Sequence, residues 1–154
     1  MFKKILVPLD GSEHSAKALN LAIQIAKKFE GKITLINVFS VAAPVVMPEP
    51  TTLTPPAVPI MSTAEFSKVA EAARKTAFNI VAEGEERVKA EGVQVETSVR
   101  EGHTVQEILK AAREGEFNLI VMGARGISKI KEILLGSVSD GVIRNSPCPV
   151  LVVK

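Results

Sequence analysis

The chain has 154 residues, enough for one domain with a sizeable core, and nineteen basic residues nearly balance seventeen acidic ones. This balance, without a dense basic stripe, argues against nucleic acid as the main partner. One cysteine excludes an internal disulfide, no signal peptide is visible, and no run reaches the eighteen or so apolar residues of a membrane span. We therefore expect a soluble, cytoplasmic protein that does not enter membranes.

The amino-terminal part predicts a strand, a helix and a second strand. Residues 4–9 form a nearly continuous apolar run, which is typical of a strand buried on both faces of a parallel sheet. Ser12 can cap a helix that ends before Gly31, and a strand over residues 33–39 follows. The short joins predict a right-handed crossover and parallel pairing of the two strands.

A proline-rich segment then interrupts the pattern. Six of the nine prolines fall between about residues 40 and 62, almost without charge. Because strands and helices resume behind it, we interpret the segment as a loop insertion within a single domain over residues 1–154. Its apolar residues could cover a ligand or meet a partner; the alternative is a disordered surface loop.

Two further helices are expected to begin with capping boxes. Residues 62–65 have the Ser-x-x-Glu spacing, and the helix behind them continues toward Gly92, with Gly84 weakening it by about 1 kcal/mol relative to alanine. Residues 93–99 alternate as a strand. Residues 104–107, Thr-Val-Gln-Glu, then predict a second capping box at the start of another helix.

The most informative stretch runs from Gly123 to Ser139. An apolar strand over residues 117–122 leads into Gly123-Ala-Arg-Gly126, and after nine intervening residues Gly136 opens a short helix with Ser137 in the cap position. Glycines let a ligand approach backbone N–H groups closely, and a helix N-terminus adds partial positive charge. The stretch therefore predicts a phosphate-binding loop, although its spacing is neither that of a Walker loop nor that of a dinucleotide fingerprint. The alternative is that the glycines only turn the chain.

With a last strand over residues 149–153, five strands alternate with about four helices. Such alternation predicts an α/β fold with an open, doubly wound, five-stranded parallel sheet of the Rossmann-like or flavodoxin-like kind, in the order 3-2-1-4-5. The first and fourth strands are then neighbours, and their carboxyl ends, at Asp10 and Gly123, flank the expected ligand crevice. Glycine spacing and topology thus indicate the same place.

Charged residues near this crevice suit a polyphosphate. Asp10 can hold Mg²⁺ that bridges phosphate oxygens, since Mg²⁺ prefers hard oxygen ligands; the alternative is a turn-forming aspartate before Gly11. Arg125 or Lys129 could supply positive charge or simply face water.

The Gly-x-x-Gly, nine residues, Gly-Ser pattern closely resembles the universal stress protein family, specifically its ATP-binding branch. The similarity covers nearly the whole chain and includes residues 5–12, 118–123 and 147–153. The resemblance implies that ATP, ADP or AMP binds with adenine and ribose near Pro8, Asp10 and the backbone of Val38. It places the phosphates on Gly126, Gly136, Ser137 and Ser139. Neighbouring positions complete the expected nucleotide-binding set: Leu9, Met122, Gly123, Arg125 and Val138.

The family is typically dimeric through its last strand, so the resemblance also implies a homodimer. The sequence supports this separately, because Val150–Val153 would lie on a sheet edge unbroken by charge. Proteins usually pair or cover such an edge, and two copies could do so by two-fold symmetry.

We therefore interpret the protein as a regulatory adenine-nucleotide-binding protein with an unidentified signalling partner. No nucleophile stands with a base at a suggestive spacing, so at most slow ATP hydrolysis is expected. Two alternatives stay open: an ATP-using enzyme of the adenylating or pyrophosphatase type, and a dimerisation module with a vestigial pocket.

Overall fold

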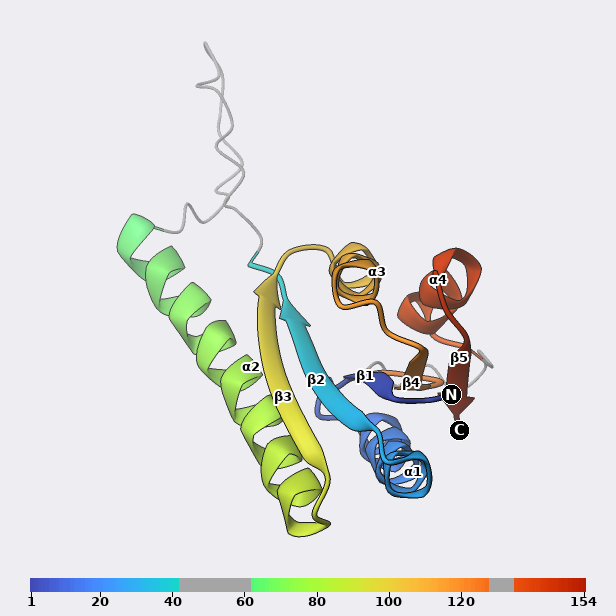
Figure 1. Cartoon of the computed structure of the whole chain (residues 1–154). Helices are drawn as coiled ribbons and strands as arrows, with labels where there is room; N and C mark the ends of the chain where they lie inside the picture. The colour runs from blue at the N-terminus through green and yellow to red at the C-terminus, as the bar shows by residue number, and fades with distance from the viewer. Residues whose placement is uncertain (42–61, 128–134) are drawn as a thin grey trace, which may run out of the picture.

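A five-stranded parallel sheet in the order β3-β2-β1-β4-β5 forms the centre of the fold (Figure 1). The strands are β1 (Lys4–Pro8), β2 (Lys32–Phe39), β3 (Gln94–Glu101), β4 (Leu119–Gly123) and β5 (Val150–Val153). The helices are α1 (Glu13–Phe29), α2 (Thr63–Ala90), α3 (Thr104–Glu114) and α4 (Ser137–Asn145). The α/β class and the strand order predicted from sequence are confirmed.

The computed structural model describes residues 1–41, 62–127 and 135–154. The proline-rich insertion lies almost wholly outside the described residues, as does Lys129. Within the described ranges, no helix combines the length and the apolar composition needed to cross a membrane.

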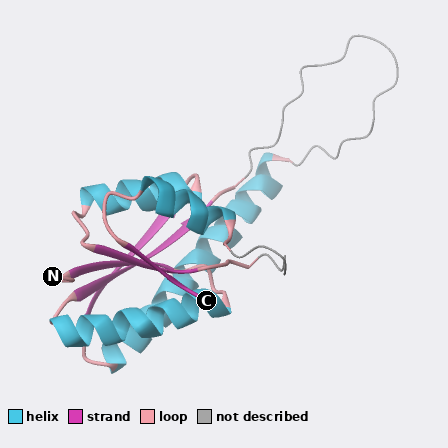
Figure 2. Cartoon of the chain, turned by 90° about the vertical axis from the view of Figure 1, so that its right-hand side faces the viewer, coloured by secondary structure: helices cyan, strands magenta, loops and turns pink. Residues whose placement is uncertain are grey.

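The two faces of the sheet carry separate apolar cores, since successive side chains of a strand point to opposite faces. Helices α1 and α2 cover one face, and α3 and α4 cover the other (Figure 2). In β1, Ile5 and Val7 belong to the first core and Leu6 to the second, and all three are fully buried. This two-sided burial explains the unbroken apolar run of β1.

The predicted caps of α1 and α2 are confirmed. The Ser15 N–H donates to the hydroxyl oxygen of Ser12 at 3.1 Å. In α2 the Glu65 N–H donates to Ser62 Oγ at 3.2 Å, and the Ser62 N–H donates to Glu65 Oε2 at 2.8 Å, which completes a capping box.

The predicted caps of the other two helices are wrong. The N-cap of α3 is His103, without a side-chain cap hydrogen bond, and Thr104 is the first helical residue. The N-cap of α4 is Gly136, and Ser137 lies inside the helix. Both helices begin one residue earlier than expected, because His103 and Gly136 adopt the extended backbone conformation of an N-cap.

Gly84 does more than weaken α2. It is buried, and a Cβ atom there would lie 2.7 Å from Leu9 Cδ1 and 2.9 Å from Leu35 Cδ1. The glycine therefore lets α2 approach the sheet closely, beside the residue that follows β1.

Candidate functional site

Strands β1 and β4 part before they end, and Pro8 explains why. The β1–β2 ladder pairs five residues, whereas the β1–β4 ladder pairs only Ile5 with Leu119 and Leu6 with Ile120. The Leu9 N–H donates to the Ile36 carbonyl of β2, so the backbone of the preceding residue, Pro8, faces β4. Proline has no N–H to continue that ladder. The sheet therefore opens between β1 and β4 at their carboxyl ends.

A cavity of about 420 Å³ lies at this opening, which is within the usual size range of ligand pockets. Its lining includes every residue that the sequence assigned to nucleotide binding: Pro8, Leu9, Asp10, Val38, Met122, Gly123, Arg125, Gly126, Gly136, Ser137, Val138 and Ser139. The structure thus brings these residues together around one space, and their contact with a nucleotide stays a prediction.

Six further residues line the cavity that the sequence had not indicated: Ser15, Ile36, Thr104, Ile108, Ile127 and Leu135. The sequence could have indicated one of them as a lining residue: Ile36 lies two residues before Val38 and so shares its face of β2. The sequence predicts Thr104 as the N-cap of a helix, not as a lining residue. Ile108 reaches the cavity only because α3 packs over the carboxyl end of the sheet, which no local pattern shows.

One carbonyl group connects the two ends of the glycine loop, the segment that runs from Gly123 to Gly136. The Ala124 carbonyl oxygen accepts hydrogen bonds from the Gly136 N–H and from the Ser139 hydroxyl, both at 2.8 Å. Ser139 is only 2% exposed, and its hydroxyl also lies 2.9 Å from the Gly136 carbonyl oxygen. Its single hydroxyl hydrogen therefore serves the loop, while the exposed Ser137 hydroxyl stands at the cavity.

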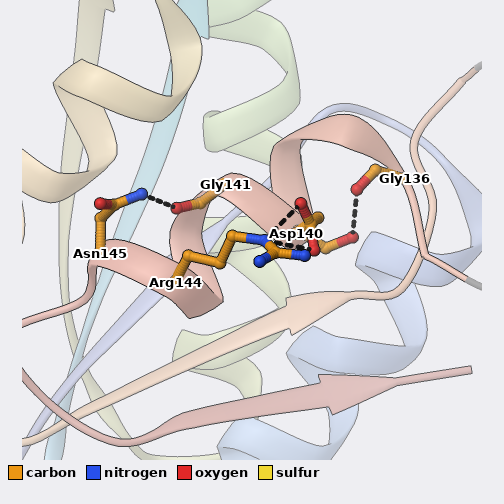
Figure 3. A network of polar contacts seen from close by, with 6 residues as sticks. Gly136, Asp140, Gly141, Arg144 and Asn145 are labelled. Carbon is orange, nitrogen blue, oxygen red and sulfur yellow. Dashed lines mark hydrogen bonds and ion pairs between the residues drawn. The ribbon is translucent and has the colours of Figure 1, made fainter.

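The N-terminus of α4 begins at this loop and has no side-chain cap. The Gly136 carbonyl accepts the Asp140 N–H at 3.0 Å, and the helix continues from there. Figure 3 shows Arg144 reaching back to Asp140, with its Nε 3.0 and 2.9 Å from the two carboxylate oxygens. The positive charge of Arg144 thus partly balances the negative charge of Asp140, which lies one turn into the helix. The first N–H groups of α4, which have no partner within the helix, are suited to an anion.

Asp10 has two different environments for its two oxygens. Oδ1 accepts the Ser12 N–H at 2.9 Å, so the turn-forming interpretation holds. Oδ2 faces the glycine loop, where a Cβ atom on Gly126 would lie only 2.6 Å away. A side chain at position 126 would therefore displace the loop or this carboxylate. The charged residues in the described lining are Asp10 and Arg125.

Gly123 has a similar packing role at the end of β4. A Cβ atom there would lie 2.8 Å from the carbonyl carbon and Cβ of His14, in the first turn of α1. The glycine lets β4 end against this turn and so sets the distance between α1 and the loop.

The described residues hold no group of three His, Cys, Asp or Glu side chains that could bind a metal ion by themselves. A divalent cation at Asp10 would need most of its oxygen ligands from a phosphate and from water, which is the usual way that proteins hold Mg²⁺.

The family model described as the universal stress protein family matches residues 1–154. The chain belongs to this family. Universal stress protein YxiE of Bacillus subtilis is 36% identical over 154 residues, which cover 100% of both chains. A universal stress protein of Methanocaldococcus jannaschii is 33% identical over 154 residues, covering 100% of this chain and 83% of that one.

Solved structures agree with the fold. Universal stress protein UspA from Lactobacillus plantarum matches with a TM-score of 0.80 at 24% identity, over 99% of this chain and 98% of that one. A second universal stress protein, solved in complex with cAMP, matches with a TM-score of 0.67 at 26% identity, over 99% of this chain and 96% of that one.

Proposed function

We propose that this universal stress protein is a regulatory protein that binds an adenine nucleotide, with ATP as the preferred ligand and ADP or AMP as alternatives. The observation that carries the proposal is the cavity between the ends of β1 and β4, whose lining joins a glycine loop to an uncapped helix N-terminus. The relative solved with cAMP supports an adenine nucleotide as the ligand class.

The two ends of the cavity suit the two ends of a nucleotide. Ile36, Val38 and Ile108 offer an apolar wall for a base. Gly126 and Ser137 offer backbone N–H groups, and Ser137 also a hydroxyl, for phosphate oxygens, while the Gly136 N–H is already bonded to the Ala124 carbonyl. Arg125 adds one positive charge at the phosphate end.

Mg²⁺ fits this arrangement, and Asp10 is the residue that would hold it. Asp10 presents Oδ2 beside the loop while Oδ1 holds the turn, so one carboxylate oxygen is directed to the phosphate end. When bound, the ion would neutralise phosphate charge that Arg125 alone cannot balance. We therefore expect ATP to bind more tightly with Mg²⁺ than without it.

We expect ATP to be held, with at most slow hydrolysis. The described lining offers one carboxylate, hydroxyl groups and no histidine, whereas rapid turnover needs a group that positions or deprotonates water. An adenylating or pyrophosphatase enzyme is the alternative that rapid product formation would favour. A dimerisation module with a vestigial pocket is the alternative that an absence of binding would favour.

We also propose that two copies pair through β5 and act in the cytoplasm on a signalling partner. Strand β5 is the edge of the sheet next to β4, and its four residues are only partly buried. An apolar edge strand is usually paired or covered, and antiparallel pairing would do this. Sedimentation equilibrium tests it: a protein that stays monomeric at high concentration would contradict the dimer.

The nucleotide content of gently purified protein tests the main proposal. Denaturation should release about one adenine nucleotide per chain, identified by chromatography, and the ratio of ATP to ADP would show whether the protein stores or slowly cleaves ATP. The Gly126→Val variant, purified in parallel, should be empty. A wild-type protein that is empty and gives no heat with MgATP would overturn the proposal.

A further inference from the structure

A buried asparagine side chain lies where the pairing of β1 with β2 ends. Asn37 is 6% exposed, and its Nδ2 donates a hydrogen bond of 2.7 Å to the carbonyl oxygen of Leu9. Leu9 is the residue after β1, between Pro8 and Asp10. The amide of Asn37 therefore fixes the backbone that enters the cavity wall.

The ladder shows which way the backbone of Val38 points. Successive residues of a strand direct their N–H and C=O groups to opposite neighbouring strands. The Leu9 N–H donates to the Ile36 carbonyl, so Ile36 faces β1. The Phe39 carbonyl accepts the Gly102 N–H, so Phe39 faces the β3 side. Val38, two residues after Ile36, therefore directs both its N–H and its C=O to the β1 side.

A regular parallel ladder would next join the Val38 N–H to the Leu9 carbonyl. The described residues form no such bond in this structure, and the side chain of Asn37 donates to that carbonyl. The peptide groups of Val38 consequently lie beyond the last pair of the β1–β2 ladder, which is Pro8 with Ile36. Val38 lines the cavity at this point.

We propose that Asn37 is a positioning residue for base recognition: by taking over the Leu9 carbonyl, it keeps the Val38 N–H and C=O available to the edge of a nucleobase. This inference rests on the proposed nucleotide function. A peptide N–H and C=O on one side of an extended strand match a base that has a neighbouring acceptor and donor. Adenine has such a pair at N1 and N6.

The test compares ATP with tripolyphosphate, which has no base, in the presence of Mg²⁺. Replacing Asn37 by leucine keeps the approximate volume but removes the donor, so the Val38 N–H can pair with Leu9. We expect Asn37→Leu to bind ATP about tenfold more weakly, the equivalent of one or two hydrogen bonds, and to bind tripolyphosphate as the wild type does. If Asn37 had only a structural role, Asn37→Leu would lose affinity for ATP and for tripolyphosphate to the same degree.

Thr34→Val is the matched control on the same strand. Thr34 is also buried, and among the described residues its hydroxyl has no hydrogen-bond partner. The valine should change neither affinity. An unchanged ratio of ATP to tripolyphosphate affinity in Asn37→Leu would overturn the role of Asn37. A wild type that binds neither ligand would instead overturn the proposed function, so the two failures are distinct.

Amide hydrogen exchange in the wild type provides a test that needs no variant. In the ligand-free protein the Val38 N–H should exchange at least about tenfold faster than the Ile36 N–H, which lies within the ladder, and it should slow when AMP is added. Equal protection of the two amides without ligand would overturn the inference, even if Asn37→Leu fails to fold.

Discussion

Helices α1 and α2 begin on side chains that satisfy their first N–H groups, whereas α3 and α4 begin without such a cap. The difference depends on where each helix starts relative to the cavity. The first residues of the two uncapped helices, Thr104 and Ser137, line the cavity, and the capping residues Ser12 and Ser62 do not. The first turn of α1 also reaches the cavity, through Ser15, but Ser12 caps that helix. Where the first helical residue itself lines the cavity, the helix has no side-chain cap and its first donors are left for something else.

The two kinds of helix start should differ in what changes their stability. A side-chain cap contributes about 1 kcal/mol to stability, and a ligand that binds only the folded protein adds stability that grows with the logarithm of its concentration above the Kd. The uncapped ends are thus expected to respond to a ligand, and the capped ends to mutation and to pH.

The largest expected effect comes from a side chain in the glycine loop. In Gly126→Val the new Cβ would come within 2.6 Å of Asp10 Oδ2, so the loop and the carboxylate must separate. We expect MgATP affinity, measured by calorimetry, to fall at least about 100-fold.

Thermal unfolding of the ligand-free variant is the control for this experiment. Gly126 is exposed, so the unfolding temperature should stay near that of the wild type while the ligand-induced increase disappears. An affinity within about threefold of the wild type would contradict the importance of the loop.

The next effect compares two serines, one from each kind of helix start. Ser12→Ala removes a cap and should lower the free energy of unfolding in urea by about 1 kcal/mol. Ser137→Ala removes a hydroxyl at an uncapped start and should change it by less than about 0.5 kcal/mol, since it caps nothing. For MgATP affinity the order should reverse, with a loss only in Ser137→Ala. Equal destabilisation of the ligand-free protein by both variants would show that the two kinds of helix start do not differ.

The same two kinds of helix start show what the sequence could predict. Residues 62–65 and 104–107 have identical capping-box spacing, yet only the first is a capping box. Glu65 bonds back to Ser62, whereas Glu107 pairs with Arg100 of β3 at 3.4 Å. That competing partner comes from another element, so the local pattern could not show it.

The fold was predictable because its signals are local and repeated. The apolar runs of β1 and β4 indicate strands buried on both faces, and short crossovers leave few possible strand orders. The glycine loop follows β4, and Asp10 closely follows β1, so neighbouring strands bring both to one cavity. Ile108 and the Asn37 bond to Leu9 were missed, because each depends on how elements pack across the sheet.

The smallest effect concerns the capping box of α2 and its dependence on pH. Hydrogen bonds from the Ser62 hydroxyl and N–H hold the pKa of Glu65 below its ordinary value near 4.5. A carboxyl group whose pKa is lowered by folding stabilises the protein above the ordinary pKa, and this contribution disappears as the pH falls through the lower, folded value. Glutamine can keep the acceptor but cannot ionise. The free energy of unfolding of Glu65→Gln should therefore differ from that of the wild type by a constant amount at neutral pH, and the difference should shrink below the ordinary pKa. Ser62→Ala should reduce the same pH-dependent part, because it removes the hydroxyl donor. Curves for the wild type and Glu65→Gln that stay parallel down to about pH 3 would show that ionised Glu65 adds nothing to this cap.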